Sequence, residues 1–204
     1  MSGCCDTGCA AEALVEKQRG TLQIVLAINA VMFVVIVVGA QLASSSALFA
    51  DSLDNLGDAL TYGFSLLVVA SGTSAKARVA LFKGVLILLG ALAVAGQVGY
   101  RLLDPTVPVF ELMGVFSLLA LAANSVCLLL LWRHRNEDIN MSSVWECSRN
   151  DIATNISVFV AAGAVWFFDS NLPDLIIATG LVILLLRSAA RVISSSLGEL
   201  RTAS

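Results

Sequence analysis

Apolar residues fill six long stretches of the chain, separated by short segments that carry charged residues, Gly and Pro. A helix needs about 20 mainly apolar residues to cross a hydrocarbon core of about 30 Å. Each stretch is long enough, so the pattern predicts an all-α membrane protein with six transmembrane helices. The predicted spans are 21–43, 46–71, 79–103, 110–132, 141–168 and 172–197.

Two of these stretches, 46–71 and 141–168, contain charged residues and are expected to score worst in hydropathy. Without them the chain would leave long unstructured loops inside the membrane, where unpaired backbone groups are not tolerated. We therefore predict that both are helices. A charge near the bilayer centre costs at least about 2.5–3.5 kcal/mol, so the charged residues of these two helices indicate a functional site.

The composition agrees with a membrane protein. Hydrophobic residues make up 58% of the chain and charged residues 13%, against about 45–50% and about 25% in soluble domains. The small net charge of -3 says nothing about nucleic acid, but the lack of a Lys/Arg-rich run argues against a nucleic-acid partner. No nucleophile–base pair is evident, so an enzyme is not expected.

The chain divides into three segments by this pattern. Residues 1–19 form an N-terminal tail that contains cysteines and lacks the apolar region of a signal peptide. Residues 20–200 form the six-helix transmembrane domain, and 201–204 are the C-terminal end. No C-terminal cytosolic domain is predicted.

Lys and Arg predict the orientation of the helices. They gather before the first span, after the second, after the fourth and toward the C-terminus, whereas the other loops hold only Arg101. Lys76, Arg78 and Lys83 are assigned to the positive segment after the second span. Both termini are therefore expected in the cytosol, with the protein in a bacterial inner membrane.

Acidic residues line one face of the second predicted helix. Asp51, Asp54, Asn55 and Asp58 stand at i, i+3, i+4 and i+7. At 1.5 Å per residue, Asp54 and Asp58 lie about 12 and about 18 Å from the outer end of the helix. Asp51 lies nearer the outer face, either as an exit-path residue or as an anchor of the helix end.

A second polar stripe lies on the fifth predicted helix. Its members are Cys147, Asn150, Asp151, Thr154 and Asn155. Asp151 lies about 14 Å from the inner end, at a height between Asp54 and Asp58. Three carboxylates at one depth repel one another unless a cation or protons neutralise them. The i,i+4 pairs Asp54–Asp58 and Cys147–Asp151 could together hold one divalent metal ion tetrahedrally.

Simpler interpretations exist for each of these residues. The acids could be protonated, or paired with Arg149, and serve packing alone. Cys147 could be a small buried apolar residue, in which case Asn150 or Asn155 is the alternative fourth ligand. Cys127 is predicted to have such a packing role.

The segment ADSLDNLGDAL (residues 50–60) resembles the second-helix signature of cation diffusion facilitators, which are six-helix metal/proton antiporters. Asp54 and Asp58 match that family's (His/Asp)-x-x-x-Asp pattern, and Asp151 matches the aspartate of its fifth helix. Cys147 stands where the family usually has His. The chain looks like the short form of the family, without the C-terminal cytosolic domain that dimerises typical members.

The resemblance implies efflux of a divalent transition-metal ion in exchange for protons. A donor set of carboxylates with one thiolate favours zinc or cadmium as the cargo, and no resident cofactor is expected. The expected partners are the metal ion, protons, the lipid bilayer and a second copy held through transmembrane helices. The alternative is a non-transporting metal sensor that uses Cys4, Cys5 and Cys9. Deleting residues 1–10 separates the two, since a transporter would keep most of its flux.

Overall fold

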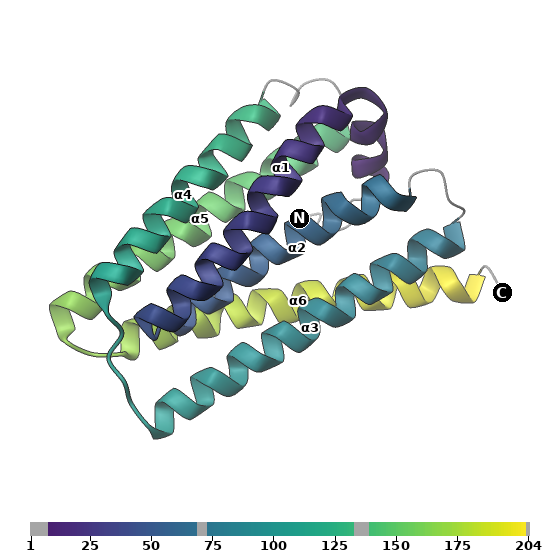
Figure 1. Ribbon diagram of the computed structural model, residues 1–204. Coiled ribbons are helices and arrows are strands. Elements are labelled where there is room, and N and C mark those ends of the chain that lie inside the picture. Colours follow the sequence, from purple (N-terminus) through teal and green to yellow (C-terminus); the bar gives the residue numbers. More distant parts are fainter. Residues whose placement is uncertain (1–7, 69–72, 133–138, 203–204) are drawn as a thin grey trace.

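The computed structural model describes the backbone of residues 8–68, 73–132 and 139–202, and the side chains of 20–64, 75–132 and 151–201 apart from Leu22 and Lys76. Within these residues the chain forms six α-helices and no strand (Figure 1), which confirms the all-α prediction for this part. The helices are α1 (Gly8–Ala43), α2 (Ser46–Val68), α3 (Thr73–Leu103), α4 (Phe110–Trp132), α5 (Ile139–Phe168) and α6 (Leu172–Thr202).

The observed helices contain the predicted spans almost completely, and several are longer. The bounds of α4 agree to the residue, whereas α1 begins at Gly8, α3 at Thr73, and α6 continues to Thr202. Hydropathy marks only the part of a helix that fits in lipid. The additional turns are rich in Ala, Glu, Lys and Arg, which favour helix in water as well. Residues 8–19, expected to be a tail, are therefore helical.

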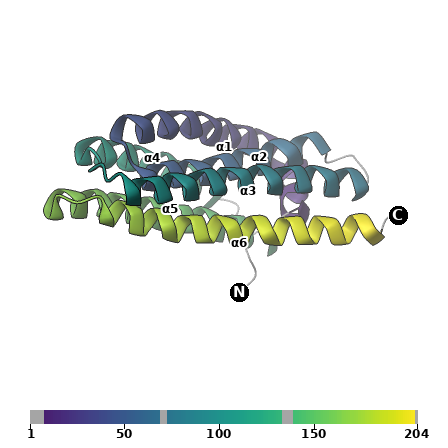
Figure 2. The same ribbon diagram turned by 90° about the horizontal axis from the view of Figure 1, so that it is seen from below.

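The six helices associate most closely as three pairs, α1 with α2, α4 with α5, and α3 with α6. Helix α2 is the central element, because it also contacts α3, α4, α5 and α6 (Figure 2). The α1–α2, α3–α4 and α5–α6 connections lie at one end of the molecule, called the α1–α2 end below. Toward the opposite, C-terminal end, α4 and α5 diverge from α3 and α6 (Figure 1).

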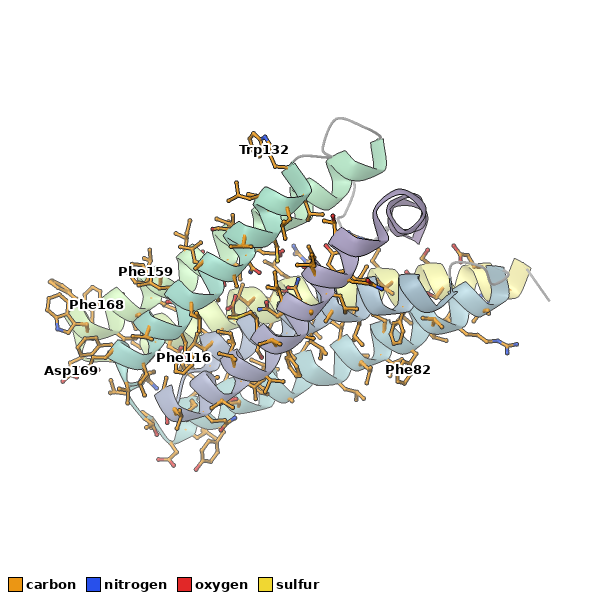
Figure 3. The ribbon with its side chains drawn as sticks, turned by 45° about the horizontal axis from the view of Figure 1, so that its top comes forward. Phe82, Phe116, Trp132, Phe159, Phe168 and Asp169 are labelled. Atoms are coloured by element: carbon orange, nitrogen blue, oxygen red, sulfur yellow. The ribbon has the colours of Figure 1, made fainter. Side chains whose placement is uncertain are left out.

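Large apolar side chains cover the outside of the bundle (Figure 3). Phe82, Trp132, Phe159 and Phe168 are between 41% and 64% exposed and point outward. Exposed apolar side chains of this kind lie on α1, α3, α4, α5 and α6, but none lies on α2 within residues 46–64. Such a surface is expected where lipid is the solvent.

Five helices are long and apolar enough to cross a membrane, and α2 is not among them within the described residues. The α5 span has the lowest mean hydropathy of the five. The expectation that the second and fifth stretches score worst is therefore confirmed. The spans are Gln23–Ala43, Ala77–Leu103, Phe110–Trp132, Asp151–Phe168 and Leu172–Arg201.

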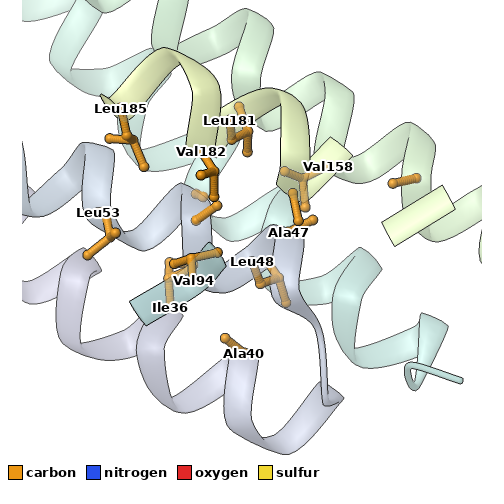
Figure 4. Packing of buried hydrophobic residues seen from close by; sticks show 14 of the residues in the cluster. Ile36, Ala40, Ala47, Leu48, Leu53, Val94, Val158, Leu181, Val182 and Leu185 are labelled. Atoms are coloured by element: carbon orange, nitrogen blue, oxygen red, sulfur yellow. The ribbon is translucent and has the colours of Figure 1, made fainter. Parts of the chain in front are cut away.

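The apolar core lies where α2 meets its neighbours (Figure 4). Ile36 of α1, Leu48 of α2, Val94 of α3 and Val158 of α5 are no more than 1% exposed. Small residues let the helices approach closely. A Cβ atom at Gly39 would lie 2.4 Å from the Phe116 ring, so α1 and α4 can pack this tightly only with glycine at that position.

The turn between α1 and α2 is largely buried, and backbone hydrogen bonds close it. Ser44 has a positive φ of 54°, and the N–H groups of Ser44 and Ser45 donate to the carbonyls of Gln41 and Ala40. This is the Schellman arrangement that ends helices. The Ser45 hydroxyl then accepts a 3.1 Å hydrogen bond from the N–H of Leu48, which caps α2.

A carboxylate from α6 completes this cap. Asp174, only 1% exposed, accepts hydrogen bonds from the N–H groups of Ser46 (2.8 Å) and Ala47 (3.1 Å) and from the Ser45 hydroxyl (2.5 Å). The first three N–H groups of α2 are thus satisfied without water. A negative charge here also complements the helix dipole. The network joins α6 to the α1–α2 turn at one end of the bundle.

Candidate functional site

The acidic stripe of α2 lies inside the bundle, as predicted from its spacing. Asp51 is 1% exposed and Asn55 is 2% exposed, while Asp54 and Asp58 are half-buried. Sequence analysis placed Asp51 nearer the outer face than Asp54 and Asp58. It lies five residues after the start of α2, and it is buried rather than exposed to solvent.

Helix α5 brings Asp151 to the same place. The carboxyl groups of Asp58 and Asp151 share a side-chain hydrogen bond, although the residues are far apart in sequence. Two carboxyl groups can lie this close only if a proton or another cation sits with them. Asp54 and Asp51 also act electrostatically on Asp151, so the three acids of α2 and Asp151 of α5 form one interacting group.

A lysine from α3 faces this group. Lys83 is 8% exposed and interacts electrostatically with Asp58. Its ammonium group donates a hydrogen bond to the hydroxyl of Thr61, which in turn donates to the carbonyl of Gly57 at 2.7 Å. Sequence analysis had wrongly counted Lys83 as a loop cation. The predicted span 79–103 already contains Lys83, so the sequence placed it in a helix but did not show which helix it would face.

Several polar atoms near the acids have no protein partner. They are Oδ2 of Asp51, Oδ1 of Asn55, and both Oδ1 and Nδ2 of Asn155, all buried. Buried polar groups in proteins are nearly always hydrogen-bonded. Since α2 and α5 run antiparallel with Asp58 beside Asp151, Asn155 lies about 6 Å from Asp151 along α5, level with Asp54 and Asn55. This region is therefore suited to water or a cation.

The structure brings together four of the five predicted site residues. Asp51, Asp54, Asp58 and Asp151 interact, whereas the side chains of Cys147 and Asn150 lie outside the described residues. Among the described side chains, no three His, Cys, Asp or Glu residues are arranged to hold a metal ion. The ligand set of the metal therefore remains a prediction.

Cys127 of α4 is buried and free, which confirms its predicted packing role. It also interacts electrostatically with Asp58 and Asp151, which sequence analysis did not foresee. Asn29 of α1 contacts its sulfur at 4.0 Å and donates a 3.0 Å hydrogen bond to the carbonyl of Val25. The cysteines at 4 and 5 lie outside the described residues, as does the side chain of Cys9.

A helical bundle with a lipid-compatible surface and interacting carboxylates in its interior defines a multi-pass integral membrane protein of the ion-transporting kind. The family model of the cation efflux transmembrane domain matches residues 22–201. The chain therefore belongs to the cation efflux family, whose members are transporters of metal cations rather than enzymes. No curated protein matches the chain at a significant level.

Proposed function

We propose that this cation efflux protein exports zinc or cadmium in exchange for protons, with Asp54, Asp58 and Asp151 as ligands of the cargo ion. The observation that carries the proposal is the hydrogen bond between Asp58 and Asp151, with Asp54 one turn away on α2. Carboxylate ligands exchange protons for a metal ion, because they bind metal in the deprotonated form. Competition between the two cations then couples their movements.

The fourth ligand is proposed to come from Cys147, with Asn150 and Asn155 as the alternatives. A thiolate beside carboxylates suits the softer divalent ions, which is why zinc and cadmium are preferred over manganese. Asn155 is the one alternative whose side chain is described, and its unpaired amide oxygen is available in the buried region.

Exposure supports a conformation that loads cargo from the C-terminal end. Asp54, Asp58 and Asp151 are half-buried, whereas Asp51, Asn55 and Asn155 are at most 2% exposed. We assign Asp51 to the exit path, beyond the ligands toward the α1–α2 end. With both termini in the cytosol, the C-terminal end faces the cytosol and α2 is the sixth membrane crossing. A dimer through transmembrane helices is part of the proposal.

Flux measurements in proteoliposomes test this function. The purified protein, reconstituted with a pH-sensitive dye, is given zinc, cadmium, cobalt, iron(II) or manganese. We expect uptake of zinc or cadmium together with opposite proton movement. Liposomes that lack the protein are the control. Metal flux without proton movement would contradict the exchange, and no flux of any of these metals would contradict export.

A further inference from the structure

Lys83 is the one lysine or arginine that is buried among the described side chains. It lies within the apolar stretch Ala77–Leu103 of α3, where a charge is costly unless it has a partner. None of the proposed ligands of the cargo ion is a cation. A buried ammonium group beside a proposed cation site therefore requires an explanation of its own.

The packing of α3 on α2 fixes where this ammonium group lies. A Cβ atom at Gly90 would lie 2.9 Å from Leu53 Cδ2, and one at Gly57 would lie 3.7 Å from Ile87 Cδ1. These contacts set an antiparallel register in which Lys83 meets Thr61, one turn from Asp58. Helix α3 also packs against α6 beside Lys83. A Cβ atom at the next residue, Gly84, would lie 2.9 Å from the Ile193 side chain of α6.

We propose that Lys83 is a resident counter-charge of the transport site, which weakens binding of the metal so that it can be released. The inference rests on the proposed function of Asp54, Asp58 and Asp151. The carboxylates of Asp54, Asp58 and Asp151 alone carry three negative charges, one more than a divalent ion neutralises. The ammonium group of Lys83 adds one positive charge beside them, so the loaded site holds less uncompensated negative charge with Lys83 than without it.

A lysine that only joins α3 to α2 would behave differently. Removing a structural contact lowers the amount of folded protein, and the remaining protein keeps its metal affinity. Removing a counter-charge makes the site more negative toward the metal, so the ion binds more tightly and leaves more slowly. The two roles are separated by comparing equilibrium affinity with maximal flux.

The test compares Lys83→Gln and Lys83→Arg with the intact protein. Zinc affinity is measured by titration calorimetry at one fixed pH, and zinc flux is measured in proteoliposomes. We expect Lys83→Gln to bind zinc about tenfold more tightly or better, with lower KM and lower maximal flux. Lys83→Arg retains the charge and should match the intact protein. Arg78→Gln, which removes an exposed charge from the same helix, is the matched control.

Lys83→Met serves the same purpose if Lys83→Gln does not fold, because an apolar side chain suits a membrane-spanning helix. Zinc affinity that is unchanged or weaker in the neutral variant would overturn the inference, as would an equal change in Arg78→Gln. If the intact protein neither binds nor transports zinc or cadmium, the proposed function itself is wrong. If only the inference about Lys83 is wrong, the intact protein still binds and transports zinc or cadmium.

Discussion

The shared hydrogen bond of Asp58 and Asp151 gives the most direct test at the level of single residues. Asp54→Ala, Asp58→Ala and Asp151→Ala should each abolish metal flux, because a divalent ion in a low-dielectric interior would lose charge compensation. Folding should be retained, since removing one of several repelling acids also removes its desolvation cost. Flux in proteoliposomes and gel-filtration profiles in detergent are the measurements.

Glu111→Ala is the matched control for these three variants, because Glu111 is an exposed acid in the first turn of α4. Its flux should equal that of the intact protein. Wild-type flux in Asp58→Ala or Asp151→Ala would refute the proposed site. Asp51→Ala is expected to reduce flux without abolishing it, since Asp51 is assigned to the exit path.

The identity of the thiol ligand is tested separately. Cys147→Ser should lower the cadmium-to-zinc flux ratio, because oxygen is a harder donor than sulfur. Cys127→Ser is the comparison, since Cys127 is the thiol that the structure places near Asp58 and Asp151. A ratio that changes in Cys127→Ser and not in Cys147→Ser would move the ligand from α5 to α4. A ratio unchanged in both leaves an asparagine or water as the fourth ligand.

Among the helices, the cap on α2 predicts a large effect on stability. Asp174→Ala leaves two buried N–H groups and one hydroxyl without an acceptor. Hydrogen bonds to a charged group contribute about 1.5–3 kcal/mol each, so the loss of three predicts a destabilisation of at least about 4.5 kcal/mol. Thermal unfolding in detergent, followed by tryptophan fluorescence, measures it. Glu111→Gln, an exposed first-turn acid, should change the midpoint little, and an equal loss in both would exclude the cap as the cause.

Helices α1, α3, α4 and α6 were predictable from sequence because their apolar stretches are of membrane length, whereas α2 and α5 were inferred because loops in their place would lie inside the membrane. The bounds of α4 agree to the residue for this reason. The i, i+3, i+4, i+7 spacing of Asp51, Asp54, Asn55 and Asp58 likewise predicted a shared inward face. Lys83 and Asp174 were not predictable, because nothing in their own sequence segments specifies the helix against which each one packs.

For the whole molecule, the excess of Lys and Arg at one end predicts the topology. A single cysteine at position 2 or 204, in a variant whose native cysteines are replaced by Ala, should resist a membrane-impermeant thiol reagent in intact cells. It should react after lysis. A cysteine at position 170, in the α5–α6 connection, should react in intact cells. Labelling of position 204 from outside would overturn the orientation.

Because Asp174 ties α6 to the first turn of α2, the bundle is joined at its α1–α2 end and its helices diverge at the other. Separating α6 from α2 at this end would leave the buried N–H groups of Ser46 and Ala47 without an acceptor, which costs free energy. We therefore expect a rearrangement of the bundle during transport to open the diverging end more easily than the tied end.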